Sequence, residues 1–340
     1  MTLKIELENQ KFLDIDFDDA VYIAGINQKK IWEIYRSLYY YFNKNPKLVE
    51  NIYGENKIEL ILNDESISEK NNDFYFINNR DSICEQMLYK KNSLLFELLN
   101  SLADDIEVSK SLERINDEHL KLEIVVQNLL NSYSDNLKVE FNDINYLDFL
   151  KNSLLVEYES EGINFPLEFM NTGLLLDEFL NFLEFKLKSS SKPVWIVLYC
   201  LDSFMSGYDK KRFINKIKIL IDKYDLKLIY LGSNLDSGFI DENDLDKIVI
   251  ADSEFHQLLP YEELLNSIKM HYPSEFNIEG KNFVDSISRV VPYVGTKENI
   301  FISNKDLVLL KVVNEILGYE TSYDLDDQLL TDAETKYLKE

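Results

Sequence analysis

The sequence predicts an α/β protein whose sheet is mostly parallel, and three observations carry this prediction. Residues 193–199 form the clearest apolar run of buried-strand type, helical spacing follows over residues 210–224, and a second apolar run occupies residues 228–232. A strand, a helix and a strand at this spacing form a parallel βαβ unit. The chain of 340 residues is 45% hydrophobic, so it can bury a core. Its six prolines and ten glycines indicate long elements with short turns between them.

The N-terminal part adds three strands and one helix. Apolar and polar residues alternate over residues 3–7 and 12–15, which predicts half-buried strands, and the apolar run 20–24 predicts a buried strand. A turn at residues 25–27 follows. Apolar residues then recur at helical spacing over residues 28–42, so a strand and a helix meet at this turn.

The middle of the chain has a different pattern. Residues 57–62, 74–77 and 247–250 predict further strands, but residues 81–133 carry no strand signal. Two leucine-rich helical stripes in that region predict an extended antiparallel helical hairpin that projects from the body. Strand-like alternation returns at residues 137–141.

Helices dominate the rest of the chain. A long helix is expected over about residues 167–188, before the buried strand of the βαβ unit. Residues 275–340 are expected to add two or three helices. From Glu315 onward this tail holds eight acidic residues against Lys336 and Lys339, so it is expected to end as an acidic segment.

Several classes of protein are disfavoured. The first ten residues lack the basic and apolar regions of a signal peptide, and no apolar run approaches the ~20 residues that a membrane helix needs. Cys84 and Cys200 stand apart, and His119, His256 and His271 have no metal-ligand spacing. We therefore expect a reduced, cytoplasmic protein with no membrane segment, no disulfide, no cysteine zinc site and no histidine-based catalysis.

Positive charge is gathered in two clusters although the formal net charge is -25. The first basic cluster consists of Lys29, Lys30, Arg36, Lys44 and Lys47. The second basic cluster consists of Lys186, Lys188, Lys192, Lys210, Lys211, Arg212, Lys216, Lys218, Lys223 and Lys227. Segregated cations in an acidic chain indicate a surface for a polyanion, although scattered solvated helix faces would give the same charge pattern.

Nucleic acid is one such polyanion, and nonspecific duplex binding needs only Lys and Arg spaced along the phosphates. No aromatic residue alternates with the lysines of the second basic cluster, which argues against a single-strand stacking groove there. No helix-turn-helix, zinc-finger or RNP signature is present, so binding is expected through the DNA backbone. The candidate DNA-binding residues are Lys29, Lys30, Arg36, Lys186, Lys188, Lys192, Lys210, Lys211, Arg212, Lys216 and Lys218.

Residues 20–30 place a strand, a turn and a helix where a phosphate-binding loop would stand. Such a loop has the form GxxxxGKS or GxxxxGKT. Here Gly25 is present, but the second glycine is absent and the residue after Lys30 is neither Ser nor Thr. Asp202 follows the later buried strand, where a magnesium-holding acid would stand. One alternative is therefore a nucleoside triphosphatase that uses Gly25, Lys29 or Lys30, and Asp202; the other is a plain turn whose helix N-terminus favours anions.

Oxygen-bearing side chains gather around the strand-like residues 137–141. They are Asp135, Asn136, Glu140, Asn142 and Asp143. Calcium accepts six to eight oxygen ligands in irregular geometry, so a calcium site is a hypothesis here. The spacing differs from that of the DxDxDG calcium loop.

The order of the elements and several local patterns resemble a known family. Residues 134–144 (SDNLKVEFNDI) are similar to its acidic strand, and residues 180–198 with residues 208–231 are similar to its helix–strand–helix–strand run. The chain thereby resembles the accessory spacer-acquisition protein of type II-A CRISPR systems, the Csn-two family, in its large streptococcal subtype. The resemblance covers about residues 90–235 best, and the tail beyond about residue 275 has no counterpart in short members.

The resemblance implies a fold and a function. The fold would be an α/β head (residues 1–90 and 135–274) related to nucleotide-binding folds, a helical leg (91–134) and a C-terminal helical extension (275–340). The protein would be no enzyme. Four copies would form a ring whose basic channel takes the ends of double-stranded DNA without reading sequence, during acquisition of new spacers in antiviral defence. Its partners would include the CRISPR effector nuclease and the spacer integrase complex.

The same resemblance implies a structural Ca²⁺ ion that stabilises the ring. Its ligand candidates are Asp135, Glu140 and Asp143. Lys138 departs from the family pattern, because short members tend to carry an acid there. A third hypothesis for the chain is a plain oligomerisation scaffold, in which the lysines pair with the acidic tail of a neighbouring copy.

Overall fold

The structure is a computed structural model, and it describes residues 1–43, 53, 58–68, 70–296, 300, 302–321 and 323. It divides into two compact units. The first unit comprises residues 1–74, 195–200 and 227–340, and the second unit comprises residues 75–194 and 201–226. The domain boundaries expected at residues 90, 134 and 274 stay predictions.

The mostly parallel sheet that the sequence predicts is present, and most of its strand residues belong to the first unit. Its strand order is β12-β11-β3-β10-β9-β6, and β3 pairs in parallel with both β10 and β11. The strands are β3 (Ala20–Ala24), β6 (Asp73–Ile77), β9 (Val194–Tyr199), β10 (Leu226–Gly232), β11 (Ile248–Ala251) and β12 (Phe255–Gln257). Backbone bonds from Val194 to Asp225 (3.0 Å) and from Cys200 to Leu231 (2.9 Å) keep one register along β9 and β10, as in parallel strands. The βαβ prediction is therefore confirmed.

A smaller antiparallel sheet holds the N-terminal strands, in the order β2-β1-β4-β5. Its members are β1 (Thr2–Glu6), β2 (Phe12–Asp16), β4 (Leu60–Leu62) and β5 (Glu65–Ser66). The strand expected over residues 57–62 begins at Leu60, and residue 57 lies outside the described residues. The predicted helix is α1 (Gln28–Asn43), which buries Ile31, Ile34, Tyr35 and Leu38.

Trp195 anchors the core of the first unit. Its indole is 1% exposed and lies between the rings of Phe17, at 5.3 Å, and Phe74, at 5.1 Å, with both ring pairs nearly parallel. The indole N–H donates to the side-chain oxygen of Asn72 over 3.1 Å, so its one polar group is satisfied. The apolar strand predicted around Trp195 is therefore the packing centre of the sheet.

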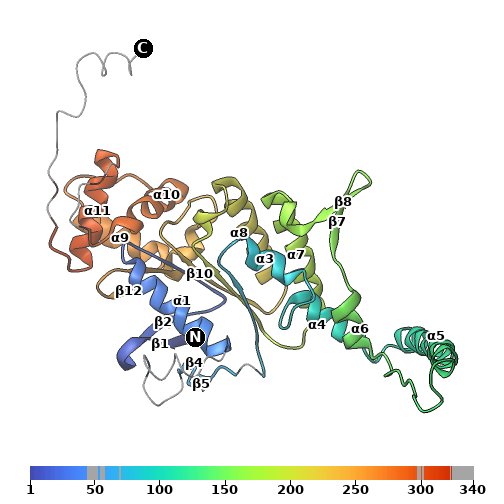
Figure 1. The fold of residues 1–340 in the computed structure, drawn as a ribbon. Coiled ribbons are helices and arrows are strands. Elements are labelled where there is room, and N and C mark those ends of the chain that lie inside the picture. The colour runs from blue at the N-terminus through green and yellow to red at the C-terminus, as the bar shows by residue number, and fades with distance from the viewer. Residues whose placement is uncertain are drawn as a thin grey trace. The chain divides into compact units, whose positions relative to one another are not determined.

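Three helices follow the sheet in the first unit and gather beside one another (Figure 1). They are α9 (Tyr261–His271), α10 (Gly280–Val290) and α11 (Asn304–Ile316). Arg289 of α10 makes a two-pronged ion pair with Asp306 of α11, at 2.9 and 3.1 Å. The two helices beyond residue 275 agree with the sequence-based expectation, and the acidic end at residues 324–340 lies outside the described residues.

The second unit is mainly helical. Its helices are α3 (Arg80–Gln86), α4 (Leu94–Asn100), α5 (Ile106–Asn131), α6 (Tyr146–Ser153), α7 (Thr172–Ser189) and α8 (Gly207–Ile221). Strands β7 (Glu157–Ser160) and β8 (Ile163–Pro166) form an antiparallel hairpin. Arg80 of α3 donates to the hydroxyl of Thr172 at the start of α7 over 3.0 Å. The long helix expected near residues 167–188 is α7.

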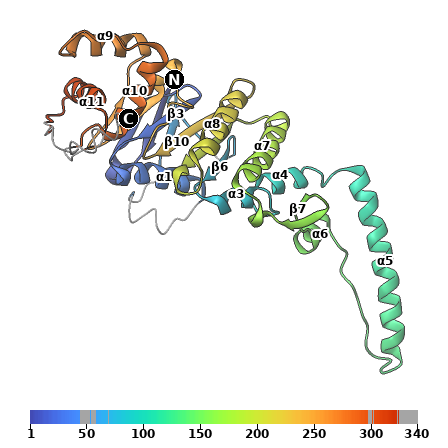
Figure 2. The ribbon, with the colours of Figure 1, turned by 90° about the horizontal axis from the view of Figure 1, so that it is seen from above.

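The expected antiparallel pair of helices over residues 81–133 is wrong. The first leucine stripe forms the short α4, which buries Leu94 and Leu95, while α5 has no buried residue. An extended segment, residues 137–144, runs back along α5 instead of a second helix (Figure 2).

Side chains of α5 hold this returning segment. Gln127 accepts from the N–H of Val139 over 2.7 Å, Glu123 accepts from the N–H of Phe141 over 2.7 Å, and Asn116 accepts from the N–H of Ile144 over 2.9 Å. Because side chains rather than a neighbouring strand satisfy this backbone, the strand expected at residues 137–141 is extended chain outside any sheet. That prediction is wrong as well.

Candidate nucleic-acid interface

Seven of the ten residues of the second basic cluster lie on α7 and α8, two helices that run side by side in the same direction; Lys192 and Lys223 follow the ends of these helices, and Lys227 lies on β10. Arg212 of α8 donates to the carbonyl of Gly173 of α7 over 3.0 Å, and Tyr224, just beyond α8, donates to Glu184 near the end of α7. Ser206 caps α8 by accepting from the N–H of Asp209 over 3.1 Å. The apolar residues of α8 face inward, so its cations divide into those drawn inward, those facing α7 and those facing solvent.

The side chain of Lys210 is buried. It is 5% exposed and forms an ion pair with Asp202 at 2.5 Å. Burying an ammonium group is costly unless a carboxylate accompanies it. Lys210 therefore reaches a phosphate only by giving up this pair.

Two cations of α8 face one acid of α7. Asp177 accepts from Lys216 over 2.7 Å and pairs with Arg212 at 3.1 Å. All three side chains are partly exposed. These pairs hold the two helices together and leave one positive charge in excess at this point.

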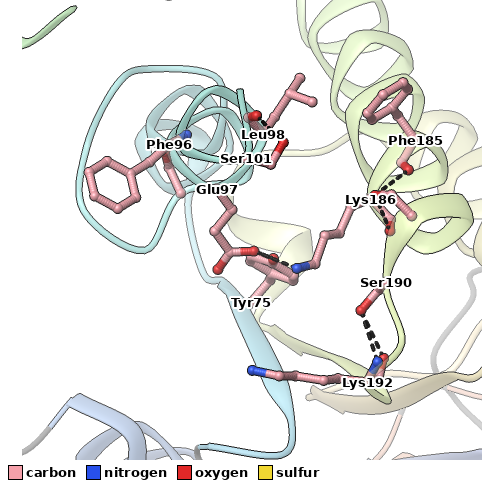
Figure 3. A network of polar contacts seen from close by, with 11 residues as sticks. Tyr75, Phe96, Glu97, Leu98, Ser101, Phe185, Lys186, Ser190 and Lys192 are labelled. Carbon is pink, nitrogen blue, oxygen red and sulfur yellow. Dashed lines mark hydrogen bonds and ion pairs between the residues drawn. The ribbon is translucent and has the colours of Figure 1, made fainter. Parts of the chain in front are cut away.

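Three candidate lysines lie at or just beyond the end of α7. Lys186 pairs with Glu97 of α4 at 2.7 Å, and the hydroxyl of Tyr75 donates to the same carboxylate over 2.8 Å (Figure 3). Lys188 pairs with Glu184 at 3.1 Å on the exposed surface. The backbone of Lys192 bonds to Ser190, and no contact is drawn to its ammonium group in Figure 3.

Three exposed lysines of this region, Lys192, Lys211 and Lys223, differ from Lys188 and Lys216 in having no ion pair with an acidic side chain among the residues that the structure describes; the first two are candidate DNA-binding residues. Lys192 follows the end of α7, whereas Lys211 lies in the first turns of α8. Because the helices are parallel and α8 has 15 residues, the two lysines lie at opposite ends of the pair, roughly 20 Å apart. Lys218 is half-buried.

The first basic cluster lies on α1 in the first unit. Lys29 is exposed and has no ion pair with any described residue. Lys30 pairs with Glu33 at 3.4 Å and lies 5.9 Å from the ring centre of Phe255. Arg36 pairs with Glu8. Lys44 and Lys47 lie outside the described residues.

The turn that resembles a phosphate loop is closed by its own hydrogen bonds. The N–H of Asn27 donates to the carbonyl of Ala251 over 3.2 Å, and the Asn27 side chain accepts from the N–H of Lys30 over 3.1 Å. Gly25 has φ +154°, and a Cβ there would lie 2.3 Å from the Ala251 oxygen. Two of the backbone N–H groups that could contact a phosphate, those of Asn27 and Lys30, are thus already bonded within the protein. Asp202, the expected magnesium ligand, is held by Lys210.

The expected calcium ligands Asp135, Glu140 and Asp143 are all exposed on the segment that follows α5. Asp135 lines a surface hollow of about 410 Å³ with Glu123 of α5, a residue that the sequence pattern did not single out. Within the described ranges, no three or more His, Cys, Asp or Glu side chains come together as they would around a metal ion. The calcium ion and its three candidate ligands stay predictions.

The counter-charges were the main feature that the sequence pattern missed. Glu97 and Asp177 neutralise cations that are far away along the chain, 39 residues in the case of Asp177 and Lys216. No local spacing signals such a partner. The only available hint was that α7 and α8 flank one strand in a βαβ unit, which predicts that they pack together.

Fold and site define the class of this protein: an α/β protein with basic helix surfaces and a closed phosphate-loop position. The chain belongs to the family described as CRISPR-associated protein Csn2, subfamily St, which matches residues 4–336. The family resemblance expected from the sequence is confirmed, and the chain has a role associated with type II-A CRISPR systems.

A solved structure of Stu0660 of Streptococcus thermophilus has the same fold. Its TM-score is 0.83 at 22% sequence identity, and the match covers 99% of this chain and 100% of that one. An SMC head bound to the C-winged helix domain of ScpA (TM-score 0.44, 12% identity, coverage 78% and 98%) and CbiO1 of Clostridium perfringens, part of an ABC transporter complex (0.38, 10%, 80% and 95%), match less well. No curated protein matches. Among the described helices, none has the length and apolar character needed to span a membrane.

Proposed function

We propose that this protein is a cytoplasmic, non-catalytic accessory factor in the acquisition of CRISPR spacers, and that it binds the ends of double-stranded DNA as a ring of four copies. Family membership over residues 4–336 is the observation that carries the proposal. The CRISPR effector nuclease and the spacer integrase complex are its proposed partners. Exposed lysines without a counter-charge among the described residues support the DNA-binding part of the proposal.

The proposed chemistry is charge neutralisation. Lysine ammonium groups replace condensed cations along the DNA backbone, so affinity falls steeply with salt and does not depend on sequence. The lysines best suited to this role are exposed and have no ion pair among the described residues: Lys29, Lys192 and Lys211. Lys188 and Lys216 join them at little cost, because exposed ion pairs contribute about 0–1 kcal/mol. Lys186 and Lys210 act structurally, since their carboxylate partners hold them in place.

A comparison of linear and circular DNA tests whether the protein binds duplex as a closed ring. Linear duplex should bind, whereas a covalently closed circle of the same sequence should not, because a closed ring admits only a free end. Equal affinity for the two forms would sink the ring proposal.

Charge reversal tests the surface. Lys192→Glu together with Lys211→Glu should weaken duplex binding and lower its salt dependence. Lys281→Glu together with Lys305→Glu is the matched control, because these two lysines are also exposed without an ion pair among the described residues but lie on α10 and α11. An equal effect of the control would assign the loss to net charge and not to a binding surface.

Two alternative functions have direct tests. A nucleoside triphosphatase would release phosphate in the presence of magnesium and lose this activity in Lys30→Ala; the closed turn at Gly25 argues against it. A plain scaffold would keep the same mass in gel filtration with and without DNA, whereas the proposed function requires a DNA-bound species.

We propose that calcium binds between two copies of the chain in the assembled ring. Because the acidic candidates do not converge within the described part of one chain, a site built on Asp135, Glu140 and Asp143 needs oxygen donors from a second copy. Added calcium should then raise the melting temperature more at high than at low protein concentration. Asp143→Asn should remove that difference, and a calcium response independent of concentration would refute a shared site.

A further inference from the structure

Aromatic rings and cations alternate along the exposed side of α1. Lys29, Trp32, Arg36, Tyr39 and Asn43 follow one another at spacings of three and four, which places them on one helix face. Trp32 and Tyr39 expose 42% and 38% of their surface. This alternation is the pattern of a base-stacking surface, and the second basic cluster lacks it.

Buried rings hold the exposed ones in place. Tyr35 is 3% exposed and stacks on Trp32 at 5.5 Å and on Tyr39 at 5.7 Å. Tyr199, at the end of β9, stacks on Tyr35 at 4.4 Å and contacts Trp32 at 5.8 Å. Burial raises the pKa of Tyr199 to about 12, so its ring stays a neutral phenol. Because the rings are ordered in advance, binding costs little side-chain entropy.

The basic residues on this face of α1 indicate that its ligand is an anion. Lys29 lies one turn before Trp32 and has no ion pair with any described residue, whereas Arg36, one turn after Trp32, is paired with Glu8 and its side chain is only 14% exposed. None of the five residues on the stripe is aliphatic or acidic. An apolar partner helix would leave Lys29 desolvated, whereas a nucleic-acid strand supplies flat bases for the rings and a phosphate for Lys29.

We propose that this face of α1 binds single-stranded nucleic acid, with bases stacked on Trp32 and Tyr39 and a phosphate beside Lys29. Seven residues separate the two rings, or about 10 Å along the helix axis, so a strand that follows the helix stacks two of its bases. The inference rests on the proposed function for the source of the strand only: an overhang or frayed end of a bound duplex.

Tryptophan fluorescence of the full chain tests the proposal, with a short oligothymidylate as the probe. The chain has two tryptophans, and Trp195 is 1% exposed, so quenching by a stacked base reports on Trp32. The oligothymidylate should quench the emission of the wild type. Trp32→Ala, followed by the anisotropy of a labelled probe, should weaken binding about fivefold to about a hundredfold. Trp32→Phe should retain part of the affinity, and a blunt duplex should bind both variants as it binds the wild type.

Phe12→Ala is the matched control. Phe12 lies in the same unit, exposes 44% of its surface, and has no ring contact among the described residues. Unchanged oligothymidylate binding in Phe12→Ala, at a melting temperature close to that of Trp32→Ala, supports the assignment.

Three results overturn the proposal: no oligothymidylate binding by the wild type, equal losses in Trp32→Ala and Phe12→Ala, or equal losses for single strand and blunt duplex in Trp32→Ala. The proposed function fails separately, through the absence of duplex binding.

Discussion

Lys210→Met separates a structural from a DNA-binding role for the most buried cation of the second basic cluster. The substitution removes the charge and keeps an apolar stem of similar length. Breaking a fully buried ion pair costs about 3–5 kcal/mol. Asp202 is 38% exposed and recovers part of its hydration, so we expect a loss of about 1–2 kcal/mol in the free energy of unfolding. The melting temperature should fall by about 1–3 °C, since the shift per kcal/mol decreases with chain length.

Lys211→Met is the control, because it removes the same charge one residue further along, where the side chain is exposed and has no ion pair among the described residues. Thermal unfolding should change by less than about 0.5 kcal/mol. The salt slope of duplex binding should fall by about 0.9 for the lost phosphate contact. Lys210→Met should leave that slope unchanged. A normal melting temperature with a reduced slope in Lys210→Met would refute the structural role.

Two further predictions concern stability. Gly25→Ala should cost about 1–3 kcal/mol or more, because its Cβ would meet the Ala251 carbonyl at 2.3 Å; Gly207→Ala, with no atom within 4 Å, should be nearly neutral in the same thermal melt. Burial raises the pKa of Asp306, but hydrogen bonds from Arg289 and Ser303 outweigh it and hold this pKa below its usual 3.8. The ionised carboxylate therefore stabilises the fold fully above pH 3.8, and this stabilisation is lost as the pH falls through the lower pKa of the folded state. Asp306→Asn should therefore cost about 1–3 kcal/mol at neutral pH, and denaturant titrations of variant and wild type should converge at low pH; a constant difference across the pH range would contradict this.

Much of the fold follows from local pattern. The apolar run of β3 is buried at all five positions, and the spacing of Ile31, Ile34 and Leu38 places them on the buried side of α1. These elements are predictable because period and apolar content decide which backbone conformation buries a face. The segment after α5 was not predictable in this way. Its alternation is typical of a strand, but the groups that bond its backbone are side chains of a helix whose bonding residues lie 12 and 18 positions earlier in the chain.

Some features of the candidate site could likewise be predicted from the sequence, whereas others depend on tertiary packing. The sequence by itself determined the family, the parallel α/β core and the presence of two basic clusters. Only the tertiary structure decided which cations are neutralised, since Glu97, Asp177 and Asp202 reach Lys186, Lys216 and Lys210 through packing. It also decided that the rings of α1 rest on Tyr199 of β9. The physical reason is that periodicity is a property of neighbours along the chain, whereas a counter-charge or a stacked ring is set by where distant segments pack.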